Sequence, residues 1–274
     1  MGAMAMQRRR TMIYVMILFG LAWVSQCLAL FGSSLTRLAR SSAAAALVLS
    51  APLGNAASAM VDVQGLMRSG ARSFAEGRVK ESVETFREVE RLRPEMRPYL
   101  WQKGIAEFVV GDFKECASQF ADDLKMHPED AEESIFLLAC DYRSQEKEKA
   151  QGNGDDSVLA AAANRLLPAQ RTADRRAVMN TVLDVFTGQK PPDALRAFAA
   201  AAERSASPLK QQQQFYAALY LGLFSESALH DIAAASVEYS KALETDYAKG
   251  LGAGDFMVTT AKVLQARLRV ESDQ

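Results

Sequence analysis

The feature that most constrains the fold is a repeat of 34 residues that begins near Val63. Two copies follow each other with no change of spacing, and seven positions match between them. The matched pairs are Leu66 and Leu100, Gly70 and Gly104, Phe74 and Phe108, Gly77 and Gly111, Ser82 and Cys116, Phe86 and Phe120, and Pro94 and Pro128. A fixed period of this length indicates stacked units that bury their apolar faces against one another.

Each copy has the pattern of two helices in succession. A glycine inside the first helix allows close approach of the second, and a glycine at its end accepts the left-handed conformation. A proline then stops the second helix, because it lacks an amide proton and clashes with the preceding turn. We expect first helices over Val63–Ala75 and Arg97–Val110, and second helices over Lys80–Leu92 and Lys114–Met126.

This pattern resembles the tetratricopeptide repeat, whose unit of 34 residues is a helical hairpin. The body from Val63 to Leu268 is similar to the tetratricopeptide family of the bacterial lipoprotein NlpI and its plastid relatives. Three segments carry that resemblance, Tyr99–Gly104, Glu132–Ile135 and Phe215–Leu223. It implies an all-α fold, an α-solenoid of tetratricopeptide hairpins with a degenerate helical middle. The bacterial members act as adaptors that bring proteases and cell-wall hydrolases together.

The remainder of the body matches the repeat less well. A third first helix begins near Glu132, and residues 143–156 are predicted to be a polar loop. Further helices are expected at 157–166, 173–186 and 194–203, the last with Asp193 as its N-cap. The run 211–214 is predicted to be an exposed helix face. The resulting divisions are a tandem at 60–148, a degenerate segment at 149–210 and a hairpin with a final helix at 211–274.

The last hairpin is predicted to begin near Phe215, with Gly222 as its close-contact glycine. Ala235, Tyr239 and Ala242 have the spacing of its second helix, provided that one residue is inserted near His230. A final helix is expected near 255–268. We find no strand pattern in the sequence.

Residues 1–59 have the composition of a targeting presequence. Arg8–Arg10 precede the apolar run Met12–Leu30, and a segment rich in Ser and Arg starts at Phe31. A second apolar stretch ends in the small residues Ala57, Ser58 and Ala59. This order resembles the presequences of thylakoid-lumen proteins in algae with complex plastids. Two alternatives are an uncleaved membrane anchor at Met12–Leu30 and the signal of a bacterial exported protein.

Charge argues against nucleic acid as the main partner. Five of the 32 lysines and arginines, and none of the 33 acids, precede Asp62. The body is therefore mildly acidic, whereas phosphate binding needs a clustered positive face.

Few residues have the pattern of catalytic or metal-binding groups. His127 and His230 stand without a serine motif or metal-ligand spacing, so we expect no catalytic, metal or cofactor site and no enzyme activity. Cys116 occupies a small repeat position and is expected to pack in the core. A disulfide with Cys140 is the alternative, in an oxidising compartment.

The resemblance implies a protein-binding concave face on the first helices. Residues of the first copy that map to it are Gln64, Met67, Ala71, Phe74 and Ala75. Those of the second copy are Pro98, Trp101, Ile105, Phe108 and Val109. Phe74 and Phe108 could instead pack between repeats, so Met67 and Trp101 are the better candidates. Exposed apolar clusters of this kind mark protein interfaces.

The expected function is therefore a non-catalytic adaptor or scaffold in the thylakoid lumen. It would assist assembly or turnover of photosynthetic complexes, with photosystem or protease subunits as partners. The alternatives are a structural subunit of a membrane complex, in membrane contact through Met12–Leu30, and an exported bacterial adaptor for proteases or hydrolases.

Overall fold

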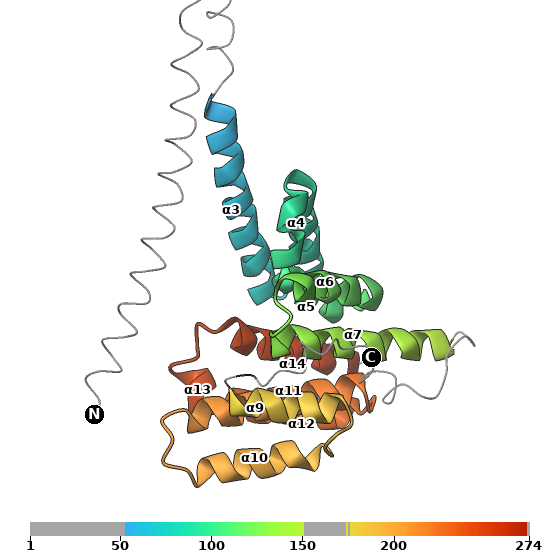
Figure 1. Ribbon diagram of the computed structural model, residues 1–274, viewed down its shortest axis with the longest axis vertical. Coiled ribbons are helices and arrows are strands. Elements are labelled where there is room, and N and C mark those ends of the chain that lie inside the picture. The colour runs from blue at the N-terminus through green and yellow to red at the C-terminus, as the bar shows by residue number, and fades with distance from the viewer. Residues whose placement is uncertain (1–52, 151–173, 175, 273–274) are drawn as a thin grey trace, which may run out of the picture. The chain divides into compact units, whose positions relative to one another are not determined.

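The computed structural model describes residues 53–150, 174 and 176–272 (Figure 1). The chain divides into two compact units, residues 1–60 and 61–274, and the structure below is that of the second unit. Every regular element in the described ranges is a helix, which confirms the all-α class. The expected presequence up to residue 52, the 157–166 helix and the 152–156 glycine-rich loop lie outside the described residues.

Twelve helices follow one another along this part of the chain. They are α3 (Leu53–Ala75), α4 (Val79–Leu92), the 3-10 helix η1 (Pro94–Tyr99), α5 (Trp101–Val110), α6 (Phe113–Met126), α7 (Ala131–Ala150), α9 (Ala177–Phe186), α10 (Asp193–Glu203), α11 (Lys210–Ser227), α12 (Ile232–Glu244), α13 (Asp246–Lys249) and α14 (Phe256–Ser272).

The two sequence copies form hairpins that are held by the same contact. A Cβ atom at Gly70 in α3 would lie 3.0 Å from the ring of Phe86 in α4. At Gly104 in α5 it would lie 2.6 Å from the ring of Phe120 in α6. Both rings are buried. The predicted role of these glycines, to let an aromatic ring of the next helix approach the backbone, is confirmed.

The hairpin of α11 and α12 uses the same device, as the sequence predicted. A Cβ atom at Gly222 would lie 2.6 Å from the ring of Tyr239, which is fully buried. The glycine and the ring are one position further apart than in the first two hairpins. The extra residue lies in the turn, where His230 adopts a positive φ of 55°. The insertion predicted near His230 is therefore confirmed.

The ends of α3 and α5 are also built alike. Gly77 and Gly111 have φ angles of 77° and 79°, the left-handed conformation that glycine adopts without strain. The amide that follows each glycine donates to a carbonyl inside the helix, Arg78 to Ser73 at 2.9 Å and Asp112 to Glu107 at 2.9 Å. These bonds satisfy carbonyl groups that a helix end leaves without partners.

Several predicted boundaries were wrong. The helix expected from Val63 begins at Leu53, and the helix expected from residue 173 begins at Ala177. The helix expected from Arg97 starts at Trp101, after η1 and the non-helical Leu100. Pro98 explains this, because the residue before a proline is disfavoured in the α conformation. Arg143, expected to open a loop, lies inside α7, which continues to Ala150. The segment 143–150 holds no Gly or Pro, and its glutamates, lysines and glutamine are good helix formers.

Two local predictions were also wrong. Asp193 is the first residue of α10 and not its cap, and its carboxylate accepts a hydrogen bond from Arg196 at 2.6 Å.

Gln211–Gln214 are half-buried in α11 and not an exposed face. Gln212 donates to the hydroxyl of Tyr247 at 3.3 Å, and Gln211 accepts the amide of Asp246 at 3.2 Å. The glutamines therefore tie α11 to α13.

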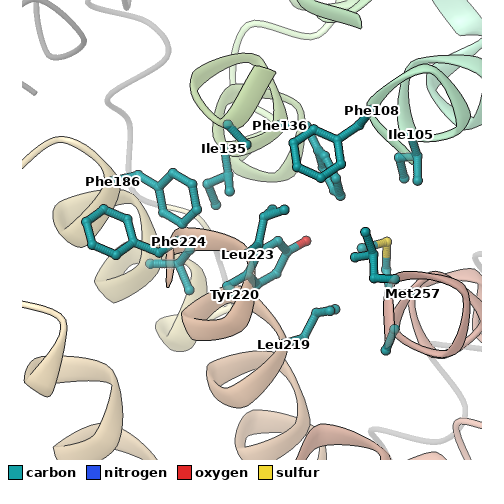
Figure 2. Packing of buried hydrophobic residues seen from close by; sticks show 14 of the residues in the cluster. Ile105, Phe108, Ile135, Phe136, Phe186, Leu219, Tyr220, Leu223, Phe224 and Met257 are labelled. Atoms are coloured by element: carbon teal, nitrogen blue, oxygen red, sulfur yellow. The ribbon is translucent and has the colours of Figure 1, made fainter. Parts of the chain in front are cut away.

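The core joins the second hairpin to the carboxy-terminal helices. Side chains from α5, α7, α9, α11 and α14 converge in it (Figure 2). The ring of Phe136 in α7 is central: it stacks on Phe120 at a centroid distance of 5.3 Å and meets Tyr220 edge-on at 6.3 Å. Apolar burial of this kind contributes about 25 cal/mol per Å², so this core is a main source of stability.

Cys116 of α6 and Cys140 of α7 form a disulfide, with Cα atoms 5.9 Å apart. The disulfide, which the sequence left as an alternative, is therefore present. Cys116 packs in the core and also crosslinks α6 to α7. Sequence could not supply this, because the pairing depends on how α6 and α7 pack. Both residues are fully buried.

Substitution of Gly222 tests the close approach of α11 and α12. We expect Gly222→Ala to lower the free energy of unfolding by about 1 kcal/mol. Overpacking costs about 1–3 kcal/mol, while alanine gains up to about 1 kcal/mol of helix propensity. Gly65→Ala in α3 is the matched control, since its Cβ would meet nothing within 4 Å; it should be neutral or stabilising. Urea denaturation measures both, and equal effects would contradict the close-contact role.

Removal of the disulfide should destabilise the fold substantially. The bridge closes a loop of 24 residues in sequence separation, for which loop-closure entropy gives about 3 kcal/mol. We expect this loss in a Cys116→Ala, Cys140→Ala double variant and, by reduction with dithiothreitol, in the unaltered chain. A thermal midpoint that dithiothreitol leaves unchanged would show that the bridge carries no stability.

Candidate functional site

The predicted binding residues of the first hairpin lie in different surroundings. Met67 and Ala71 are half-buried against a small cluster formed by Val63, Phe86, Val89 and Leu100. Gln64 is exposed. These three residues share one face of α3, on which Met67 keeps some accessible surface.

Three of the predicted residues are buried and present no surface to a partner. Phe74, Ile105 and Phe108 have exposed fractions of 0%, 1% and 0%. For Phe74 and Phe108 this burial agrees with the alternative that they pack inside the fold and do not face a groove. The periodic spacing that places a residue toward a groove also places it toward a neighbouring helix. That neighbour is α14 for Phe74, and α6 and α7 for Phe108. Phe74 stacks on Phe256 of α14 at a centroid distance of 5.2 Å.

Trp101 is half-buried at the start of α5, and its ring meets Phe256 edge-on at 5.0 Å. Pro98 is half-buried in η1. Ala75 is exposed and Val109 buried; both line an open cleft of about 1040 Å³ between the α3–α4 turn and α14. The structure therefore distributes the predicted face among a small cluster, the core, this cleft and a cavity beside Trp101.

That cavity is the candidate site. It has a volume of about 280 Å³ and lies between α5, the first turn of α7, α11 and the start of α14. We call it the acidic–aromatic cavity. Its lining residues are Trp101, Ile105, Phe120, Asp130, Glu132, Glu133, Phe136, Tyr216, Asp255, Phe256 and Met257.

Three of its four carboxylates have hydrogen-bond donors within the protein. Glu132 accepts from the hydroxyl of Tyr220 at 2.7 Å and from the guanidinium of Arg176 at 2.5 Å. Asp130 accepts the amide of Glu132 at 2.8 Å and so satisfies a donor in the first turn of α7.

Asp255 is placed at the start of α14 in the same way. One carboxylate oxygen accepts the amide of Met257 at 2.9 Å. The other accepts the hydroxyls of Tyr216 at 2.9 Å and Tyr247 at 2.7 Å. Asp255 thus fixes the entry of α14 against α11 and α13, next to the aromatic wall.

Glu133 differs from the other three carboxylates of the cavity in its hydrogen bonding. Its Oε2 atom is buried and has no hydrogen-bond partner among the described residues. Burial, and then the charges of Asp123 and other nearby acids, raise the pKa of Glu133 to about 8. Asp123 in α6 is itself fully buried, its Oδ2 atom is likewise without a partner in the described ranges, and burial raises its pKa to about 7.

A second buried polar cluster links α4 to α5. Lys103 is only 2% exposed and its Nζ atom lies 2.5 Å from Oε2 of Glu90. The Nζ atom is 3.8 Å from Oε1 of Glu107, a fully buried residue whose pKa burial raises to about 7. Arg87 lies 3.7 Å from the same oxygen. Arg87 also pairs with Asp112 before α6, and Glu90 pairs with Arg97 of η1, so the cluster ties α4 to α5 and to the segments that follow the two helices.

Sequence reasoning missed Glu133, Tyr216 and Asp255. They belong to α7, α11 and the start of α14, and no spacing pattern links them. The acids before and within the first turn of α7 were visible as a helix-start pattern, but that pattern gives no information on a cavity.

The two histidines lie in separate environments. His127 follows α6, is exposed and meets the ring of Tyr99 edge-on at 5.9 Å. His230 is in the α11–α12 turn, with Nδ1 3.1 Å from Oε2 of Glu146. Within the described residues, no group of three or more His, Cys, Asp or Glu is arranged to hold a metal ion. None of the described helices has the length and apolarity needed to cross a membrane.

Stability should fall as pH rises from 6 to 9. Glu107, Asp123 and Glu133 have folded-state pKa values of about 7, 7 and 8, above their ordinary values of 4.5, 3.8 and 4.5. The folded state therefore holds these protons more tightly, and that stabilisation is lost as pH rises through 7 to 8. The pKa values of Glu90 and Asp122 are lowered, so these two groups change protonation state below this pH interval.

Thermal midpoints measured at low salt between pH 6 and 9 test this prediction. Glu133→Gln should reduce the fall above pH 7, because the amide cannot ionise. A midpoint that stays constant or rises over the same interval would contradict the assignment of buried, protonated carboxyls.

Comparison of the chain with protein-family models, curated proteins and solved structures finds no significant match.

Proposed function

We propose that the chain is a non-catalytic adaptor of the tetratricopeptide type, an α-solenoid that holds other proteins. One observation carries this proposal: the same glycine–aromatic contact holds α3 to α4, α5 to α6 and α11 to α12. Hairpins of one design, two of them in a fixed period of 34 residues, are typical of repeat proteins. Such proteins present extended surfaces and act mainly by binding.

The disulfide supports a location outside a reducing compartment. Disulfides persist in oxidising environments and are rare where thiols are kept reduced. A buried bridge between Cys116 and Cys140 agrees with the targeting pattern of residues 1–59. We therefore propose the thylakoid lumen as the site of action, with assembly or turnover of photosynthetic complexes as the process. The same bridge also agrees with an exported bacterial adaptor for proteases or hydrolases.

A membrane-anchored structural subunit is the alternative from a different class. It would retain the apolar run Met12–Leu30, which gives the sequence-based reason for considering it. The amino terminus of the mature protein separates the two functions. A start near Met60 supports the lumenal adaptor, and a retained Met12–Leu30 supports the anchored subunit.

Affinity capture from native membranes tests the proposed adaptor. Carboxy-terminally tagged full-length chain should retain a small, reproducible set of protein partners. Trp101→Ala should reduce their recovery about tenfold, because truncation of an aromatic anchor costs about 2 kcal/mol or more at a binding surface. Leu251→Ala is the matched control, since Leu251 is fully exposed and outside the cavity.

Thermal melts of both variants must show that the fold persists before recovery is compared. The same preparation yields the amino terminus by sequencing. Recovery of the same proteins at the same level with Trp101→Ala would overturn the role of this face, and absence of any reproducible partner would overturn the adaptor function.

A further inference from the structure

The acidic–aromatic cavity differs from the other clefts in its chemistry. Its walls are the rings of Trp101, Phe120, Phe136, Tyr216 and Phe256, and its polar groups are four carboxyls. Among the described residues that line it there is no lysine, arginine or histidine. The open clefts beside α10 and α14, by contrast, mix both signs of charge.

The protein's own donors satisfy the other three carboxyls but not Glu133. Arg176 and Tyr220 donate hydrogen bonds to Glu132, while Asp130 and Asp255 accept hydrogen bonds from backbone amides at helix starts. Glu133 lines the cavity, its Oε2 atom is buried with no donor in the described part of the chain, and Asp123 lies near enough for its charge to act on it. A buried carboxyl in this position is stabilised either by a proton or by a ligand that donates N–H bonds and carries positive charge.

The aromatic walls favour an organic cation. An ammonium or guanidinium group near the face of a tryptophan or tyrosine is attracted by the ring, by about 0.5–2 kcal/mol. The alkyl chain that carries such a group can pack on Phe136 and Phe256. A volume of about 280 Å³ lies just under the range of about 300–1,000 Å³ for drug-sized ligands, so the cavity suits a single long side chain.

We propose that the acidic–aromatic cavity binds the cationic end of a lysine or arginine side chain supplied by a partner protein, with Glu133 as its main carboxylate. This proposal rests on the adaptor function, because the partner supplies the cation. It names the residue type that the adaptor recognises.

Fluorescence of Trp101 reports on the cavity directly. The chain has two tryptophans, Trp23 and Trp101, so a full-length Trp23→Phe chain leaves one reporter on the cavity wall. The probes are the N-acetyl methylamides of lysine, arginine and norleucine, the last being neutral with a similar stem. We expect a saturable change with lysine and arginine, and at least about tenfold weaker binding of norleucine, a difference of about 1.4 kcal/mol.

Glu133→Gln in the same background should weaken binding of the cationic probes by about fivefold or more and leave norleucine unchanged. Glutamine keeps the shape of the protonated side chain, and a thermal melt checks that the fold is intact. Glu244→Gln is the matched control for net charge, because Glu244 is exposed and does not line the cavity; it should bind as the parent does.

Equal binding of norleucine and the cationic probes, or no saturable change with any of them, would overturn the inference without any variant. Partner capture that Glu133→Gln leaves undiminished would also overturn it, while the adaptor function would stand. Probe binding with no captured protein would sink the adaptor function, and with it the partner as the source of the cation.

Discussion

The contact on which this fold depends is that of a glycine in one helix with an aromatic ring of the next. At Gly104 the absence of a side chain lets Phe120 lie against the backbone of α5, and the other face of that ring stacks on Phe136 of α7. At Gly222 the ring of Tyr239 approaches in the same way, and its hydroxyl donates to Glu226 at 2.9 Å. Glu226 in turn pairs with Arg267 of α14. One small residue thus sets the distance within a hairpin and also positions the ring that joins it to the following helix.

Burial of charge follows from the same close packing. Helices that approach this closely leave little room for water around Glu107, Asp123 and Glu133, and burial raises the pKa of each. Glu107 is offset by Lys103 and Arg87, whose positive charges act on it. The positive charges of Lys103 and Arg97 also act on Asp123. Around Glu133, by contrast, Asp123 and other nearby acids raise its proton affinity further. Glu107 therefore lies close to cations of the chain itself, whereas Glu133 is surrounded by acids and would be neutralised by a proton or a bound cation. This difference separates a structural cluster from a candidate site.

Sequence predicted those parts of the fold that local rules determine. The period of 34 residues, the glycine helix ends and the inserted residue near His230 all follow from spacing, and the structure confirms them. Features that depend on packing between distant segments were not predictable. Whether Cys116 and Cys140 can form a disulfide depends on the relative position of α6 and α7. Whether Gln211–Gln214 are exposed or bonded depends on the position of α13. Phe74, Ile105 and Phe108 show the limit most clearly, because the same spacing places an apolar side chain toward an open groove or toward a covering helix. The covering helix is α14 for Phe74, and α6 and α7 cover Phe108. Glu133, Tyr216 and Asp255 line one cavity because α7, α11 and the start of α14 come together in the fold.

Helix α14 gives the acidic–aromatic cavity its physical significance. Phe256 packs on Phe74 and Trp101, so it covers part of the surface of α3 and α5. The same ring is also a wall of the cavity, and Asp255 beside it ties α14 to Tyr216 and Tyr247. A ligand in the cavity would therefore contact the core of the second hairpin and the entry of α14 together. Any ligand that binds only the folded arrangement stabilises it by mass action. Occupation of the cavity would thus strengthen the attachment of α14 to the repeat, and the binding surface and the stability of the carboxy-terminal helix would be thermodynamically coupled.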